Sequence, residues 1–337
     1  MADLLKLCFA LMNLPNVRSS NVTSTSEPPS GRSAPLSGIA MVLCAAVLWG
    51  TTGTAQSFAP LTLSPYVVGA MRLVMAALFF VIYLSLMSHG AVSLATGLRT
   101  LPWRWVATAG VCMAVYNLAF FAGVKASGIA VGTAVAIGSG PIWAGVLQFV
   151  FTGKAPRGVW WWGTLLAVTG GSLMVMSGGG DGGGSVGAMS FSTSGIVMCL
   201  LAGMAYAAYA LINKRLVALA APAVVTASVF VIAAALAFPL AVAVSDSMAI
   251  NSAGWMLVGY LGVVATGVSY LLFSSGLRSI SGVTGVTLAL GEPLTAFVLA
   301  ILVVGEHPGL LAYSGLGLVL AGLGLVIWTE LKAQSKH

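Results

Sequence analysis

Long apolar runs separated by short polar stretches dominate the chain. Each run is close to the roughly 20 residues that an α-helix needs to cross a bilayer. In hydrocarbon, every backbone N–H and C=O group must be satisfied within its own segment, so each run is predicted to be a helix. The sequence therefore predicts an all-α polytopic membrane protein with ten transmembrane helices: 37–58, 65–87, 104–124, 128–151, 157–177, 194–214, 220–244, 253–277, 281–304 and 309–329.

The remaining stretches are polar or rich in glycine. Residues 1–36 are predicted to be a disordered cytoplasmic tail, because Ser, Thr and Pro predominate in them. Their apolar start is too short to span; we weigh a mis-assigned start or a surface-lying segment against a signal peptide. The glycine-rich residues 178–193 lack the Lys and Ser/Thr of a phosphate loop and are predicted to be a flexible periplasmic linker. Residues 330–337 are predicted to be a cytoplasmic tail.

The blocks on either side of the linker, 37–177 and 194–329, resemble each other. Ser37 to Val42 corresponds to Ser194 to Cys199, and the glycines at 163 and 170 correspond to those at 315 and 322. Because each block holds five spans, the second is predicted to lie inverted in the membrane around a central cavity. Inverted repeats are typical of secondary transporters, which bind substrate near the bilayer midplane and expose it to each side in turn.

Composition and charge agree with a membrane protein. Hydrophobic residues make up 59% of the chain and charged residues 6%, whereas soluble domains are about 25% charged. The net charge is +7, but the basic residues occur singly or in pairs, so we expect no nucleic-acid partner. With both termini in the cytoplasm, twelve Lys and Arg residues fall inside, Lys125 falls outside and Arg72 lies within a span. This asymmetry favours that orientation.

Two charges lie deep in predicted spans, Arg72 in the second and Glu292 in the ninth. Each costs on the order of 3 kcal/mol at a helix centre unless it is paired, protonated or hydrated. For Arg72 we favour a structural role, by snorkelling outward, by bonding freed carbonyls or by pairing with a carboxylate. Glu292 is the better functional candidate, since Gly140 occupies its place in the first half. Whether Glu292 carries a coupling proton stays open.

Polar and aromatic side chains recur on one face of several spans. Trp49 and Thr52 in the first span correspond to Tyr206 and Tyr209 in the sixth. Matched stripes in both halves favour a shared cavity over hydrogen bonds between neighbouring helices. The candidate substrate-binding residues are Trp49, Thr52, Tyr116, Asn117, Ser139, Trp143, Tyr206, Tyr209, Tyr270 and Glu292. The aromatic rings are expected to contact an apolar side chain, and Asn117, Thr52 and Ser139 to bond amino and carboxylate groups.

Proline occurs at corresponding places in the fourth and ninth spans, at Pro141 and Pro293. Each is predicted to kink its helix and to leave the carbonyl four residues earlier, at Ile137 or Ala289, without its usual partner. Water or substrate is then able to use that carbonyl. A static kink packed by neighbouring helices is the alternative.

Other chemistries have little support. The four cysteines show no metal-ligand spacing and the three histidines lie in loops or at the terminus. No set of catalytic groups shares one membrane depth. We therefore expect no metal, no cofactor and no enzymatic activity.

The proline spans, the loops Gly153 to Pro156 and Gly305 to Pro308, and the glycine-spaced last helix of each half resemble EamA-type members of the drug/metabolite transporter superfamily. Arg72, Glu292-Pro293 and Gly305-Glu306 are the most specific matches, whereas Lys154 departs from the acid often found there. The resemblance covers about residues 37–329 and is strongest to YddG-type exporters of aromatic amino acids. It implies ten helices around a cavity formed mainly by spans one, three, four, six, eight and nine.

Together these features predict a bacterial inner-membrane transporter that exports amino acids, aromatic ones included, or facilitates their passage by alternating access. Its expected partners are the lipid bilayer, a small-molecule substrate and, as a candidate coupling ion, the proton; a monomer is the expected state. Alternatives are a multidrug or nucleotide-sugar-type transporter and, from another class, a membrane enzyme or lipid-handling subunit that moves no substrate.

Overall fold

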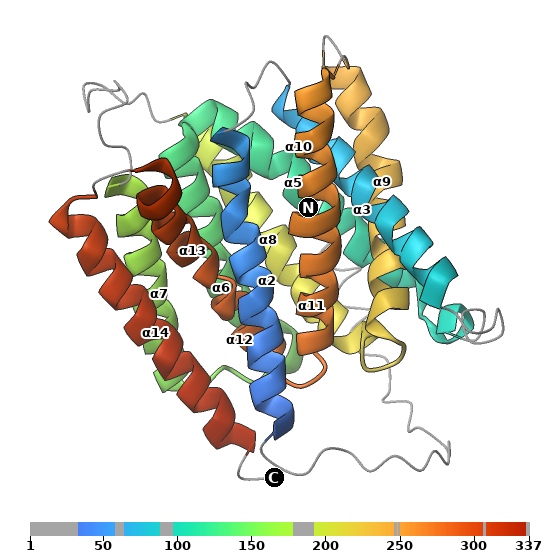
Figure 1. Ribbon diagram of the computed structural model, residues 1–337. Coiled ribbons are helices and arrows are strands. Elements are labelled where there is room, and N and C mark those ends of the chain that lie inside the picture. Colours follow the sequence, from blue (N-terminus) through green and yellow to red (C-terminus); the bar gives the residue numbers. More distant parts are fainter. Residues whose placement is uncertain are drawn as a thin grey trace.

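A computed structural model describes residues 33–57, 64–87, 97–177, 192–245, 248, 250–305 and 308–334, which form a bundle of helices (Figure 1). Residues 1–32 of the predicted disordered tail, most of the glycine linker, Glu306 and residues 335–337 lie outside the described residues. The last four residues of that predicted tail, 33–36, are helical, because α2 begins at Ser33. The elements are α2 (Ser33–Ser57), α3 (Pro65–Met87), α5 (Trp103–Ser127), α6 (Ile129–Thr152), α7 (Gly158–Ser177), α8 (Thr193–Leu216), α9 (Pro222–Val244), α10 (Ser252–Gly262), η1 (Val263–Val268), α11 (Ser269–Gly276), α12 (Gly282–Leu288), α13 (Gly291–Leu299), η2 (Ala300–Val304) and α14 (Leu310–Gln334). No strand occurs among these described elements.

Within the described residues, ten helical stretches are long and apolar enough to cross a membrane. Each coincides with one of the ten predicted segments, usually to within a few residues. The largest difference is at the last helix, because α14 continues to Gln334 and so takes up part of the predicted C-terminal tail. The prediction of an all-α polytopic membrane protein is confirmed.

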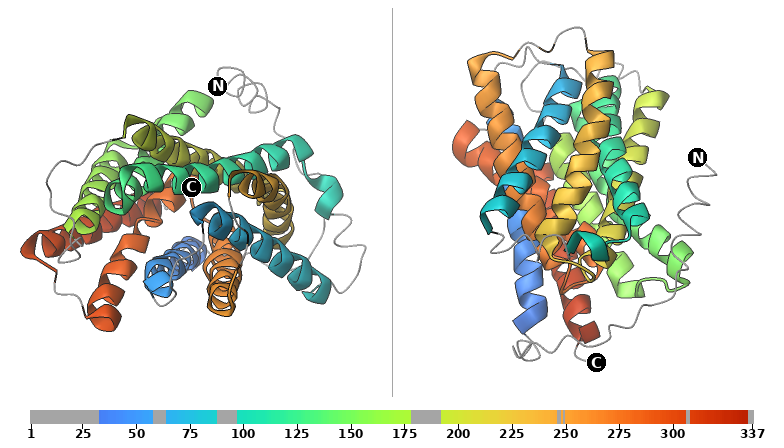
Figure 2. Two further views of the ribbon diagram at one scale, coloured as in Figure 1. Left: turned by 90° about the horizontal axis from the view of Figure 1, so that it is seen from above. Right: turned by 90° about the vertical axis from the view of Figure 1, so that its right-hand side faces the viewer.

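The two halves of the chain interlock. Helices of the first half pack mainly on helices of the second, with α7 on α14, α5 and α6 on α8, α3 on α9, and α2 on both α11 and α13. Seen from above, α13, α2 and α10 with α11 lie side by side across one face of the bundle (Figure 2). In this row α2 lies between α13 and α11 and contacts both.

Glycine allows the closest helix crossings. A Cβ atom added to Gly322 of α14 would lie 2.5 Å from the carbonyl oxygen of Gly163 in α7, and one on Gly315 would lie 2.6 Å from the carbonyl of Gly170. Membrane helices associate through such small residues because close backbones gain van der Waals contact that lipid cannot replace. The glycine spacing of the last helix in each half is therefore a packing feature.

The eighth and ninth spans are not uniform α-helices. The eighth passes from α10 through the π-helical turn η1 into α11. The hydroxyl of Thr266 donates to the carbonyl oxygen of Leu261 at 2.7 Å, five residues earlier, which is the spacing of a wide turn. The ninth is divided by a tight turn at Ala289 and Leu290 and ends in the second π-helical turn, η2. Neither wide turn was predicted from the sequence.

A buried carboxylate joins two helices, α12 and α14, at the end of the bundle where α8 and α11 terminate. Glu330 of α14 accepts hydrogen bonds from the backbone N–H of Ser281 at 2.9 Å, from the Ser281 hydroxyl at 3.0 Å and from the Thr284 hydroxyl. Nearby, Lys214 of α8 donates to the carbonyl oxygens of Leu277 and Arg278 at 2.6 and 3.2 Å. The start of α12 is thus fixed to α14 and lies beside the end of α8.

Replacing Glu330 by alanine is expected to destabilise the folded protein by about 2 kcal/mol, because hydrogen bonds to a charged acceptor are lost and buried donors are left unpaired. The thermal unfolding midpoint of the detergent-purified protein measures the effect. Ser314→Ala is the control, since the Ser314 hydroxyl is exposed and bonds only its own helix. Equal midpoints for the two variants would contradict the role of Glu330.

Candidate functional site

Aromatic rings from four helices meet inside the bundle. Trp49 of α2 lies 5.0 Å from Tyr270 of α11 and 6.3 Å from Tyr206 of α8, measured between ring centroids. Tyr206 in turn lies 5.3 Å from Tyr116 of α5 and 6.4 Å from Tyr209. We call these five residues the aromatic cluster. The structure thus brings together five of the aromatic side chains that the sequence marked as candidates.

Three polar atoms of the aromatic cluster are buried without a hydrogen-bond partner among the described residues. They are the indole Nε1 of Trp49 and the hydroxyls of Tyr206 and Tyr209. A buried donor that makes no hydrogen bond costs free energy, and such groups in native proteins usually meet water or a ligand. Trp49 is only 6% exposed. These atoms are able to bond water or a ligand, which makes the aromatic cluster the candidate site.

Glu292 lies beside the aromatic cluster at the start of α13. A Cβ atom on Gly50, the residue after Trp49, would lie 2.6 Å from the backbone oxygen of Glu292. The neighbouring Gly291 packs against Ala46 in the same way. Because small residues let α2 and α13 approach so closely, the Glu292 side chain is held next to the cluster. That side chain is half-buried.

Arg72 reaches the same region from α3. Its Nε donates to the hydroxyl of Thr266 at 3.1 Å, and Thr266 belongs to the wide turn η1. The Arg72 guanidinium lies within electrostatic range of the Glu292 carboxylate. Neither side chain forms an ion pair with a described residue. The observed contact of Arg72 is this threonine hydroxyl on the wide turn, and the structural role favoured from the sequence stays a prediction.

The smaller polar candidates bond mainly to their own helices. Asn117 is buried and donates through Nδ2 to the carbonyl of Met113 at 3.0 Å. Ser139 is half-buried, donates to the carbonyl of Ala136 at 3.3 Å and contacts Gly203 of α8. Thr52 is half-buried on α2. Their proposed bonds to substrate stay predictions.

Some residues lie elsewhere than the sequence indicated, and others were missed. Trp143 is half-buried but makes no ring contact with the aromatic cluster within the described part of the chain. Phe273, one turn after Tyr270, lies 5.5 Å from Trp49 and extends the cluster. The sequence could have indicated Phe273 only by its position one helical turn beyond a predicted site residue. A phenylalanine that lines a site and one that only packs against neighbouring helices look the same in an apolar span.

The two prolines occupy different local structures. Pro141 lies inside α6, which runs unbroken from one end to the other. Before Pro293 the helix is interrupted, and the backbone N–H of Glu292 donates to the carbonyl oxygen of Ala289 at 2.9 Å. The expectation that the Ala289 carbonyl is left free for water or substrate is therefore wrong. The tight turn at Ala289 and Leu290 supplies a donor three residues along in place of the one that proline lacks.

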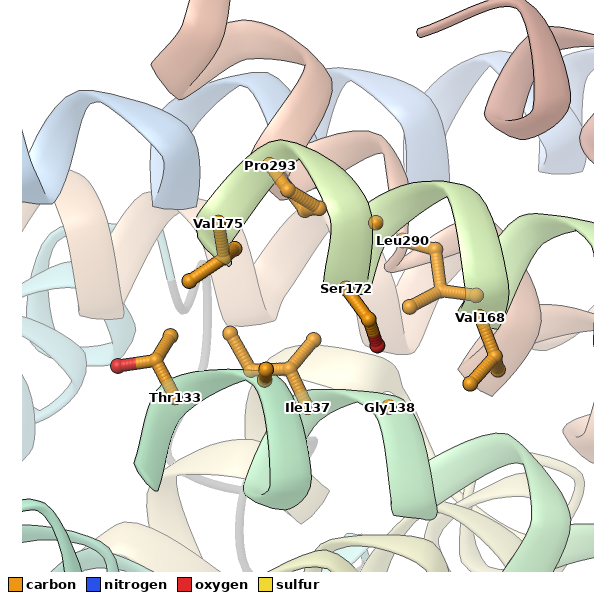
Figure 3. A pocket seen from close by; sticks show the side chains of 10 residues that line it. Thr133, Ile137, Gly138, Val168, Ser172, Val175, Leu290 and Pro293 are labelled. Carbon is orange, nitrogen blue, oxygen red and sulfur yellow. The ribbon is translucent and has the colours of Figure 1, made fainter. Parts of the chain in front are cut away.

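A small crevice lies between α6, α7 and the junction of α12 with α13 (Figure 3). The labelled side chains come from both flanking helices and converge on the gap between them, with Ile137 of α6 facing Ser172 of α7. The lining residues are Thr133, Ala134, Ile137, Gly138, Val168, Gly171, Ser172, Val175, Leu290 and Pro293. Because this lining is largely apolar, the crevice is packing space beside the proline turn, and we assign it no ligand.

A helical bundle with ten apolar spans and a polar, aromatic site inside it defines a multi-pass membrane protein. The model of the EamA-like transporter family matches the chain twice, over residues 36–176 and 193–328. The chain belongs to this family. The relative described below is a bacterial protein. Membership indicates a membrane transporter rather than an enzyme.

Two individual comparisons add to the family match. The uncharacterized transporter YwfM of Bacillus subtilis (strain 168) is 38% identical over 288 residues, which cover 85% of this chain and 91% of that protein. A solved crystal structure aligns with 90% of this chain and 99% of its own at a TM-score of 0.72 and 18% identity. The second likeness supports the fold alone.

Proposed function

We propose that the protein is a bacterial inner-membrane transporter that exports amino acids, aromatic ones included, or facilitates their passage by alternating access. The main support for this function is the aromatic cluster, in which Trp49 and Tyr206 have unpaired donors and beside which the half-buried Glu292 lies. Rings suit an apolar or aromatic side chain, and unpaired polar groups suit a small polar ligand.

The contacts between helices support an inverted repeat and hence alternating access. Gly38 meets Gly276 where α2 crosses α11, and Gly195 meets Gly123 where α8 crosses α5. The sequence pairs Gly38 with Gly195 and Gly123 with Gly276. Corresponding residues therefore make corresponding crossings in the two halves. Two halves packed in this way have two similar arrangements, one for each side of the membrane.

Basic residues at one end of the bundle support a cytoplasmic location for that end. Lys214 bonds the loop that contains Arg278, and Arg215 lies 5.1 Å from the ring of Trp105 at the start of α5. By contrast, Lys125 lies near the other end of α5, 5.9 Å from the ring of Tyr66. Because positive residues concentrate on cytoplasmic sides, we propose that both termini are cytoplasmic. We take the monomer as the functional unit.

Liposomes that contain the purified protein and are preloaded with unlabelled phenylalanine are expected to accumulate labelled phenylalanine by counterflow, saturably. Trp49→Ala should reduce this flux at least about tenfold, because truncating a central aromatic contact commonly costs 2 kcal/mol or more. Trp162→Ala is the control, since Trp162 is 68% exposed. If no amino acid shows saturable flux with the unmodified protein, the proposed substrate class is wrong.

A further inference from the structure

Two opposite charges lie close to each other inside the bundle without forming an ion pair. Arg72 and Glu292 are both half-buried, and each belongs to a membrane-spanning helix. Arg72 uses Nε for Thr266, so four of the five N–H donors of the guanidinium stay without a described protein partner. The Glu292 carboxylate likewise accepts no hydrogen bond from a described residue. Both groups thus keep most of their bonding capacity.

The contacts place both charges next to the aromatic cluster, since the Tyr116 hydroxyl lies within electrostatic range of Arg72 and of Glu292. Thr266, which holds Arg72, lies one turn before Tyr270 on the same span, and Tyr270 lies 5.0 Å from Trp49. Glu292 is fixed by its backbone contact with Gly50, the residue after Trp49. Each charge is therefore held by a residue that is close in sequence to one ring of the cluster, Tyr270 for Arg72 and Trp49 for Glu292.

A charged group in a membrane interior needs a partner of opposite charge or water. An arginine and a glutamate in a membrane interior commonly pair with each other, but here Arg72 bonds the Thr266 hydroxyl and forms no ion pair with Glu292. A ligand with one charge would satisfy one group and leave the other unpaired, which is costly. A ligand with both charges satisfies both.

We propose that the site recognises a zwitterion, with Arg72 binding the carboxylate of an α-amino acid, Glu292 binding its ammonium group and the aromatic cluster holding the side chain. The planar guanidinium matches a carboxylate through two parallel hydrogen bonds. The other titratable groups near these charges are the phenol groups of Tyr116, Tyr206 and Tyr270, which all belong to the aromatic cluster. The inference rests on the proposed transport of amino acids and names the chemistry that selects them.

Three ligands with the same aromatic ring test the inference without any substitution. They are L-phenylalanine, phenethylamine, which lacks the carboxylate, and 3-phenylpropionate, which lacks the ammonium group. Calorimetry on the detergent-purified full chain is expected to show phenylalanine binding at least about tenfold more tightly than either analogue, since each analogue loses a charge-assisted bond. Equal affinity of phenylalanine and either analogue, or no binding of any of the three, overturns the inference.

Substitutions assign the two charges to their partners. In Arg72→Gln, phenylalanine and phenethylamine should bind equally, because the carboxylate no longer adds affinity. In Glu292→Gln, phenylalanine and 3-phenylpropionate should bind equally. Arg99→Gln, at an exposed arginine, should keep the preference of the unmodified protein. If Arg72→Gln and Glu292→Gln weaken all three ligands to the same extent, the two residues are structural and the inference fails.

Flux measurements separate this inference from the proposed function. If phenylalanine counterflow is saturable but both analogues inhibit it as strongly as phenylalanine itself, the proposal of amino acid transport stands. The inference that the site recognises a zwitterion is then wrong. Absence of counterflow for every amino acid would remove the transport proposal. Counterflow that phenylalanine inhibits at least about tenfold more strongly than either analogue supports both.

Discussion

Replacing Glu292 by glutamine is expected to lower phenylalanine transport about tenfold or more and to remove its dependence on pH between about 5 and 8. Glutamine keeps the shape of the side chain but lacks the negative charge, and a hydrogen bond to a charged group is worth about 1.5–3 kcal/mol. The other titratable groups near Glu292 are Arg72, Tyr116 and Tyr206.

Initial rates of labelled phenylalanine uptake at several pH values, in liposomes with and without a pH gradient, measure both effects. Thr295→Val serves as a control on the same helix, one turn beyond Gly291, because the Thr295 hydroxyl bonds only the Gly291 carbonyl. If Glu292→Gln transports with the pH dependence of the unmodified protein, Glu292 carries no coupling proton. If its rate is also unchanged, Glu292 contributes nothing to substrate binding.

Replacing Gly322 by valine is expected to destabilise the folded protein by about 3 kcal/mol, at the upper end of what overpacking costs. A Cβ atom at this position would lie 2.5 Å from the Gly163 carbonyl oxygen and 2.5 Å from the backbone nitrogen of Ala167. Both are backbone atoms of α7, so no side chain is able to rotate out of the way. Relief requires that α7 and α14 separate along their length.

Gly324→Val, two residues further along α14, provides a matched control. A Cβ atom there meets nothing within 4 Å, and Gly324 is exposed. The two valine variants have the same helix propensity, so their difference in thermal unfolding midpoint isolates the crossing with α7. Equal midpoints would show that α7 and α14 adjust to each other more easily than the glycine contacts indicate.

The spans were predictable because hydrocarbon imposes one strong rule on the backbone. An apolar run of suitable length has to be helical, so the ten segments coincide with ten observed helical stretches. The aromatic cluster was predictable for a similar reason. Trp49 and Tyr206 each belong to a stripe with helical spacing, and stripes at corresponding places in both halves favour a common interior.

Local backbone geometry was not predictable in the same way. In the wide turn η1 the Thr266 hydroxyl bonds a carbonyl five residues back, and threonine in a span has the same sequence signature when it bonds an ordinary turn. The partner of Arg72 followed from this turn and was missed with it. Likewise, Pro293 indicates an interrupted helix, but the sequence does not show that the Glu292 N–H donates a hydrogen bond to the Ala289 carbonyl instead.

The wide turn η1 also bears on how the protein would respond to blocking reagents. It occurs in the eighth span, whereas the corresponding third span, α5, is an α-helix throughout. Under the proposed alternating access, two halves that differ in this way would give two access states of unequal free energy, and one state would predominate when no substrate is bound. A tight-binding amino acid analogue too bulky to be carried should therefore inhibit strongly from one face of the membrane and weakly from the other, with its sidedness reporting which way the empty protein faces.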